Sequence, residues 1–154
     1  MTTRTTPIIL WTRPDNTVVV TELLDPNADI EAEVAKIKAE RPELTYRKTT
    51  DFDETPVSIN PFYPALVMDE NGELAYDMVK ARELYREGVR QLRQPALAAL
   101  DVEFQRAFET GDTVKQAEIV AKKNELRDAP NNPEIDTAQD LNDLQRLVPE
   151  ILAN

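Results

Sequence analysis

The sequence predicts an α+β protein, with its strands in the N-terminal half and its helices in the C-terminal half. Two short runs rich in β-branched residues open the chain, and a turn signal separates them. Later, residues 77–111 repeat apolar side chains every three or four positions, as one face of a helix requires. We therefore predict a ββαβ unit over residues 1–50, a proline-rich connector over 51–76 and a helical hairpin or bundle over 77–154.

The N-terminal unit follows from local signals. Residues 7–12 and 17–21 read as the two strands of a β-hairpin, because the Arg-Pro-Asp-Asn segment between them supplies turn geometry. Asp29 is placed to cap a helix, and Pro42 ends it. Residues 44–49 then read as a third strand. A unit of this size is marginally stable unless it docks on something else.

The connector begins with a change of composition. Residues 51–64 contain three prolines and no glycine, which predicts an ordered but irregular backbone. Its apolar side chains are expected to anchor it to a neighbouring element; they are Val57, Ile59, Phe62 and Tyr63. A brief strand over 65–68 and a turn over 69–72 lead to a second short extended segment at 73–75.

The long helical stretch begins at Asp77, which we expect to cap it, and ends at Gly111, a good left-handed terminator. Pro95 should kink or interrupt it, because proline lacks the N–H that a helix interior needs. Two apolar sets share the helical spacing. The first is Met78, Ala81, Tyr85 and Val89; the second is Leu97, Leu100, Phe104 and Phe108.

Two further helices follow. Asp112 or Thr113 should cap the first, which runs to about Arg127. Its expected inward residues are Val114, Ala117, Ala121 and Leu126. Thr137 with Asp140 resembles a capping box and should open the last helix, which ends at Pro149. The apolar residues of that helix are Leu141, Leu144, Leu147 and Val148.

The amino-acid composition narrows the classes of function that we expect for the chain. The chain has 18 basic and 29 acidic side chains, a net charge of −11 that argues against a nucleic-acid backbone as partner. It contains neither cysteine nor histidine, so thiol chemistry, the commonest general base and the commonest transition-metal ligands are missing. No apolar run is long enough for a signal-peptide core or a membrane span. We therefore expect no enzyme, no cofactor and no membrane partner.

Two acidic groups could bind a hard cation. The turn from Asp69 to Glu73 is rich in oxygen ligands, yet it lacks the ligand spacing of a calcium loop. Asp51, Asp53 and Glu54 also cluster, but no predicted element holds them in place. We expect a plain turn and a solvated linker, and no metal site.

A row of arginines is the charge feature with a defined geometry. Arg82, Arg86, Arg90 and Arg93 lie on one face of the long helix. Two interpretations stay open: ion pairs within the helix, from Glu83 to Arg86 and from Glu87 to Arg90, or docking on a carboxylate-rich protein surface, which suits the planar fork of arginine.

Several motifs of the C-terminal half resemble, in combination, those of tailed-bacteriophage proteins described as tail assembly chaperones or tail fibre assembly proteins. The motifs are Lys-Ala-Arg-Glu at 80–83, Leu-Asp-Val-Glu-Phe at 100–104, Arg-Ala-x-Glu-x-Gly-Asp at 106–112 and Leu-Arg-Asp at 126–128. The resemblance runs from Met78 to the C-terminus, whereas the N-terminal half is similar in layout only. Phe62-Tyr63-Pro64 stands where such proteins often carry an aromatic-rich segment with a tryptophan.

The resemblance implies a non-catalytic protein that binds a trimeric tail fibre or another tail component in the host cytoplasm and assists its folding. It implies no cofactor, nucleic acid, membrane or small-molecule substrate. The expected protein-binding residues are Arg82, Arg86, Arg90, Arg93, Phe62, Tyr63, Ile151 and Leu152. One alternative is a permanent tail or fibre adaptor in the virion; another is an enzyme that works with carboxylates alone.

Overall fold

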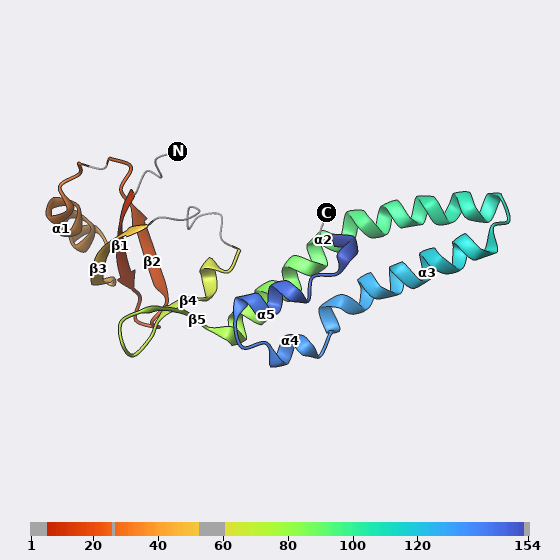
Figure 1. Cartoon of the computed structure of the whole chain (residues 1–154). Coiled ribbons are helices and arrows are strands. Elements are labelled where there is room, and N and C mark those ends of the chain that lie inside the picture. The colour runs from red at the N-terminus through yellow and green to blue at the C-terminus, as the bar shows by residue number, and fades with distance from the viewer. Residues whose placement is uncertain (1–5, 26, 53–60, 153–154) are drawn as a thin grey trace. The chain divides into compact units, whose positions relative to one another are not determined.

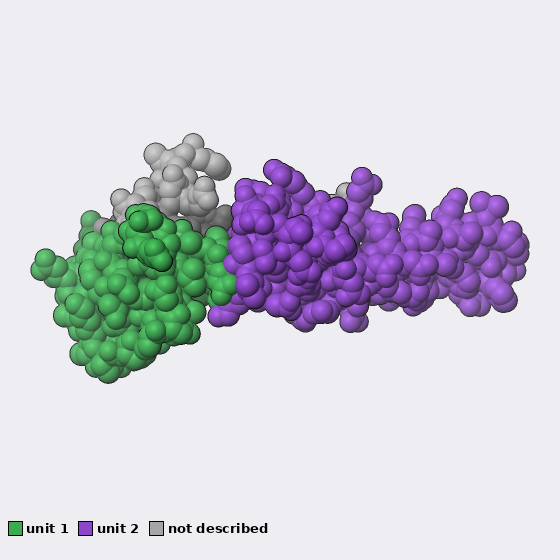
Figure 2. All heavy atoms as spheres, turned by 90° about the horizontal axis from the view of Figure 1, so that it is seen from below, with its two compact units in different colours: residues 1–77 green, residues 78–154 purple. Residues whose placement is uncertain are grey.

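The computed structural model describes residues 6–25, 27–52 and 61–152, and it confirms the α+β class (Figure 1). Two compact units divide the chain where the long helix begins. Unit 1 comprises residues 1–77 and unit 2 comprises residues 78–154; Figure 2 colours them separately. Each unit has a core of its own, so each is described by itself.

Unit 1 is built on a three-stranded antiparallel sheet. Its strands are β1 (Thr6–Thr12), β2 (Val18–Glu22) and β3 (Thr45–Phe52), and the order β2-β1-β3 places β1 in the centre. In the hairpin, Leu10 of β1 pairs with Val20 of β2. The turn between them uses Asn16 in the left-handed region, with a φ of 66°. The predicted hairpin and third strand are therefore confirmed.

Both faces of β1 are buried, because consecutive side chains of a strand point to opposite sides. Ile8 and Leu10 pack on one side, with β4 (Leu66–Met68). Ile9 and Trp11 pack on the other, against α1 (Ile30–Glu40). The carboxylate of Asp29 accepts a hydrogen bond from the backbone N–H of Ala32 at 3.1 Å, which confirms the predicted cap of this helix.

The described part of the predicted connector covers one face of the sheet. It holds a 3-10 turn, η2 (Tyr63–Ala65), followed by a hairpin of β4 and β5 (Leu74–Tyr76). Gly72 closes this hairpin with a φ of 78°. Residues 61–77 therefore belong to the compact core of unit 1; Val57 and Ile59 lie outside the described residues.

Unit 2 is organised around α2 (Met78–Glu109), which packs against α3 (Thr113–Asp128) as a helical hairpin. Pro95 does not interrupt α2, but the helix axis changes direction midway along its length (Figure 1). Gly111, with a φ of 71°, terminates α2, and the carboxylate of Asp112 caps α3 by accepting from the N–H of Lys115 at 2.9 Å. Both signals are confirmed.

The inward face predicted for α3 is wrong at three of its four positions. Leu126 is buried, but Ala117 and Ala121 are exposed and Val114 is 70% exposed. The buried residues are instead Ile119 and Leu126, which pack on Leu100 and Ala107 of α2.

Polar residues with long side chains complete the packed face of α3. The amide of Gln116 donates to the carbonyl of Ala107 at 3.2 Å, and Lys123 forms an ion pair with Asp101. The ammonium of Lys123 also lies 5.7 Å from the ring centroid of Phe104. The face of α3 thus buries the aliphatic stems of polar residues rather than small apolar ones.

The C-terminal segment contains more turns than predicted. It consists of η3 (Ala129–Asn131), α4 (Glu134–Thr137), α5 (Leu141–Arg146) and η4 (Glu150–Leu152). The cap of the last helix is Asp140, whose carboxylate accepts from the N–H of Asp143, and not Thr137, which ends α4. The carboxylate of Asp143 in turn accepts from the N–H of Gln139, the residue before this cap, at 2.9 Å.

Candidate protein-interaction site

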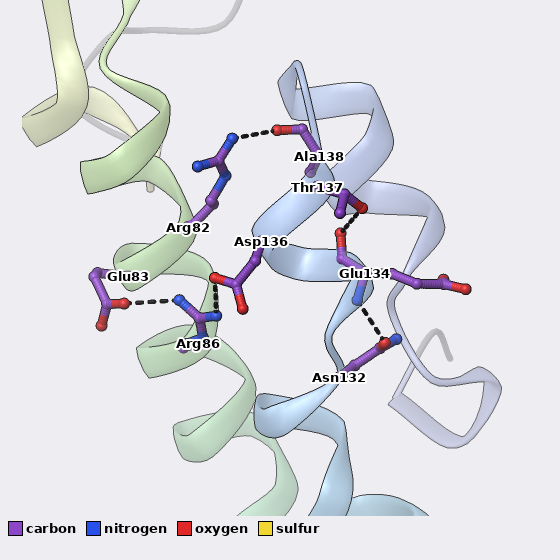
Figure 3. A network of polar contacts seen from close by, with 8 residues as sticks. All are labelled: Arg82, Glu83, Arg86, Asn132, Glu134, Asp136, Thr137 and Ala138. Atoms are coloured by element: carbon purple, nitrogen blue, oxygen red, sulfur yellow. Dashed lines mark hydrogen bonds and ion pairs between the residues drawn. The ribbon is translucent and has the colours of Figure 1, made fainter.

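Three of the four arginines in the predicted row are bound inside unit 2. They extend from α2 toward α3, α4 and the residue that follows α4 (Figure 3 shows Arg82 and Arg86). Each finds carboxylate or carbonyl oxygens contributed by the C-terminal part of the chain. The row therefore links distant segments of unit 2.

Arg86 makes two ion pairs in opposite directions. Its Nη1 donates to Glu83 at 2.7 Å and its Nη2 donates to Asp136 of α4 at 2.6 Å (Figure 3). The side chain is only 15% exposed. The hydrogen bond that Arg86 donates to Asp136 is the main reason why the pKa of Arg86 is raised above its ordinary value. Arg86 therefore joins α2 to α4 with a charge that persists at any ordinary pH.

Arg82 and Arg93 bind backbone carbonyls at the ends of helices. Nη2 of Arg82 donates to the carbonyl of Ala138 at 2.8 Å, just after α4. Nη1 of Arg93 donates to the carbonyls of Leu126 at 3.3 Å and of Arg127 at 2.8 Å, in the last turn of α3. Helix C-termini leave such carbonyls without intrahelical partners and carry a partial negative charge, so both arginines act as caps.

Arg90 differs from the other three. It forms only a surface ion pair with Glu87 at 3.5 Å, and its side chain is 44% exposed. The two predicted pairs along the helix, Glu83 with Arg86 and Glu87 with Arg90, are therefore confirmed. Among the four arginines, Arg90 has the side chain with most freedom to meet a partner protein.

The aromatic candidates belong to the core of unit 1. Tyr63 packs against the cluster that contains Ile8 and Leu10, and its hydroxyl accepts a hydrogen bond from the N–H of Val20 at 3.0 Å. That bond occupies a backbone donor of β2. Phe62, immediately before η2, is half-buried. Tyr63 therefore fixes η2 against the sheet.

The apolar candidates at the C-terminus also pack internally. Ile151 and Leu152 of η4 are half-buried, and both contact the α2–α3 cluster that contains Leu100 and Leu126. Much of their surface is thus removed from solvent within unit 2.

Exposed apolar side chains occur where the sequence predicted a core. Phe108, expected inside the hairpin, is 63% exposed, and Val114 at the start of α3 is 70% exposed. Both lie at the end of the hairpin, on either side of Gly111. Leu92 and Val102 of α2 are 58% and 53% exposed. The period of apolar residues indicated helices correctly, but it could not tell which side of each helix meets a neighbour.

The acidic turn of unit 1 is held by its own backbone. The carboxylate of Asp69 accepts from the N–H groups of Asn71 at 2.8 Å and Glu73 at 2.9 Å, and the latter bond is the largest cause of the lowered pKa of Asp69. No group of three or more acidic residues in the described parts of the chain could hold a metal ion. Of the second acidic group, Asp53 and Glu54 lie outside the described residues.

A groove of about 570 Å³ lies in unit 2, beside the end of α3. Its lining includes two carboxylates, from Glu125 and Asp128, together with the apolar side chains of Leu147 and Pro149. Apart from these carboxylates, none of the described residues that line the groove carries a hydroxyl, amine or phenol group that could act as a nucleophile.

No family model, curated protein or solved structure matches this chain. None of the described helices is long and apolar enough to cross a membrane. The fold and contacts define a two-unit α+β protein whose helical unit carries exposed apolar side chains.

Proposed function

We propose that this chain is a non-catalytic phage protein that binds a tail fibre or another tail component and assists its folding and assembly. The observation that carries the proposal is the combination of motifs from Lys80 to Asp128. Within it, Arg-Ala-x-Glu-x-Gly-Asp spans the end of α2 and the turn into α3. The proposal assigns the partner by this resemblance.

The end of the helical hairpin is the binding surface that the contacts favour. Phe108 occupies the first variable position of the motif, and Val114 follows the motif by two residues. Both are mostly exposed, whereas Ile151, Leu152 and Tyr63 already pack within their own units. Exposed aromatic and branched side chains are suited to shield an apolar surface that a partner exposes before it is fully assembled.

The arginines have a smaller part in this proposal. Arg82, Arg86 and Arg93 hold unit 2 together, so their replacement would damage binding indirectly. Arg90 is the one of the four placed to orient a partner through a surface charge, which affects the association rate more than the affinity.

Co-expression with the tail fibre protein of the same genome tests the proposal. We expect a higher soluble yield of the fibre, and a complex that survives affinity capture and size-exclusion chromatography with mass determination. Replacing Phe108 and Val114 together by Asp should abolish capture, whereas Leu24→Asp in unit 1, at an 88% exposed position, should leave it unchanged. If both proteins are soluble and elute apart, the proposal fails.

A particle proteome distinguishes the assembly role from the adaptor role. A chaperone should be missing from purified virions or present far below the amount of the fibre. A permanent adaptor should be present in a fixed ratio to it.

A further inference from the structure

A second apolar stripe runs along α2, on the side that does not pack against α3. It consists of Gly88, Leu92, Pro95, Ala99 and Val102, which are separated by four, three, four and three residues. This is the spacing of a helix that packs along another helix. Leu92 is 58% exposed and Val102 is 53% exposed, and Pro95 and Ala99 are exposed as well. The stripe therefore has no covering element within the described part of unit 2.

The stripe is bordered by uncharged residues along one side. Gln91, Ala98 and Gln105 lie there, and both glutamine amides donate to glutamates of the same helix, at 3.1 Å each.

The two charged residues between Gln91 and Val102 both have partners on α3, although the side chain of Asp101 remains 63% exposed. Arg93 binds carbonyls of α3, and Asp101 pairs with Lys123. In a chain with 31% charged residues, this stretch of α2 thus carries no charged residue without a partner. Two copies that meet there place few like charges side by side at the contact.

No contact among the described residues requires a glycine at position 88. A Cβ built at this position meets nothing within 4 Å, and the backbone is ordinary helix. Glycine inside a helix costs about 0.5–1 kcal/mol relative to alanine. Its missing side chain leaves the backbone open to close approach by a second helix.

We propose that this face of α2, from Gly88 to Val102, is a self-association surface on which the α2 helix of a second copy packs in the antiparallel direction. A contact centred on residue 97 sets Leu92 of one copy against Val102 of the other. It also sets Arg106 against Gly88, where there is room for its stem, and near the carboxylate of Glu87. A parallel pair would instead place the two Arg106 side chains together and align the helix dipoles unfavourably.

The contact is short, so the association is weak. Fourteen residue steps from Gly88 to Val102 span about 21 Å of helix. Two such faces bury less accessible surface than a stable protein interface, which buries about 1,200–2,000 Å² in total. We expect a dimer that dissociates on dilution. This inference does not depend on the tail fibre, and it concerns residues other than Phe108 and Val114.

Sedimentation velocity over a wide range of concentration tests the proposal. The natural chain should pass from monomer to dimer as its concentration rises toward millimolar. Replacing Leu92 and Val102 together by Glu should weaken dimerisation at least tenfold, because four like charges meet at the contact. The matched control replaces Val114 and Val120, two exposed valines of α3, by Glu. It should dimerise as the natural chain does. Unchanged circular dichroism verifies that each variant is folded.

Charge exchange makes the result specific. A variant with Lys at positions 92 and 102 should also be monomeric alone, and mixing it with the Glu variant should restore a dimer. A natural chain that stays monomeric up to millimolar concentration overturns the proposal. So does a Glu variant that dimerises as the natural chain does.

Cross-linking tests the direction, and the chain contains no cysteine that could interfere. Leu92→Cys and Val102→Cys, mixed and oxidised, should give a disulfide between the two variants. Leu92→Cys alone should form no disulfide-linked dimer. Efficient cross-linking of Leu92→Cys with itself would overturn the antiparallel arrangement.

Discussion

The two units use their apolar residues differently. In unit 1, four consecutive residues of β1, Ile8 to Trp11, are at most 1% exposed, because a helix covers one face of the strand and a hairpin covers the other. In unit 2, α2 and α3 bury one side of each helix and leave Leu92, Val102 and Val114 more than half exposed. A strand enclosed on both sides has little apolar surface left for a partner, whereas a two-helix hairpin has outer faces to offer.

Charge adds to the contrast. Seven basic and fifteen acidic residues give unit 1 a net charge of −8, and eleven basic and fourteen acidic residues give unit 2 a net charge of −3. Four of the eleven basic side chains of unit 2 serve as internal links: Arg82, Arg86, Arg93 and Lys123. Unit 2 therefore combines weak repulsion with exposed apolar surface, and we expect it to carry the interactions of the molecule.

The largest loss of stability should come from placing a charge between α2 and α3 in unit 2. Leu100 is 5% exposed, and Leu100→Asp leaves a carboxylate without a partner between α2 and α3. We expect a loss of about 4 kcal/mol or more and an unfolded hairpin. Thermal unfolding followed by circular dichroism measures this. Val102→Asp, two residues away on the exposed side, should stay within about 0.5 kcal/mol of the natural chain. Equal losses in both variants would show that the two sides of α2 are not distinct.

Unit 1 should respond to a cavity without any added charge. Leu10 is fully buried, so Leu10→Ala should reduce the free energy of unfolding by about 2–5 kcal/mol. Denaturant unfolding followed by the fluorescence of Trp11, the only tryptophan, reports on this unit. Leu24→Ala, at an 88% exposed position, is the control. A shift of the same size in the control would contradict the enclosed core.

The arginine row should divide into structural and surface members. A double-mutant cycle with Arg86→Ala and Asp136→Ala should give a coupling energy of about 1 kcal/mol. The same cycle for Arg90 and Glu87, both more than 40% exposed, should give about 0.3 kcal/mol. Chemical denaturation of the four single and two double variants supplies the values. A stronger coupling at Arg90 would reverse the assignment.

One substitution should increase the stability of the chain. Gly88→Ala removes the backbone entropy of a helical glycine, and its methyl group meets no atom of the chain. The free energy of unfolding should rise by about 0.5–1 kcal/mol at a concentration where the protein is monomeric. A loss of stability would mean that something within the chain already lies against Gly88.

The elements of unit 1 could be predicted because their signals are local. The turn at Asn16, the cap at Asp29 and the β-forming run along β1 each depend on residues close in sequence. In unit 2 the same was true of Gly111 and Asp112, which end one helix and begin the next.

The contacts of unit 2 depend on partners far along the chain. Arg86 pairs with a carboxylate 50 residues away in the sequence. Arg82 and Arg93 bind backbone carbonyls, which every residue has and which no residue type therefore indicates. The packed face of α3 was missed because it has only two buried apolar residues, Ile119 and Leu126. Gln116 and Lys123 also bury aliphatic stems there, which a count of apolar residues ignores. The proposed binding surface is therefore the end of the hairpin, around Phe108 and Val114, and not the row of arginines.

Hydrogen–deuterium exchange of the chain, alone and with the co-expressed tail fibre, tests most directly whether unit 2 carries the interaction. We expect slower exchange in the complex for peptides around Gly111, from Phe108 to Val114, and unchanged exchange in β1 and β3. Protection confined to unit 1, or a fibre that causes no protection anywhere, would contradict the account.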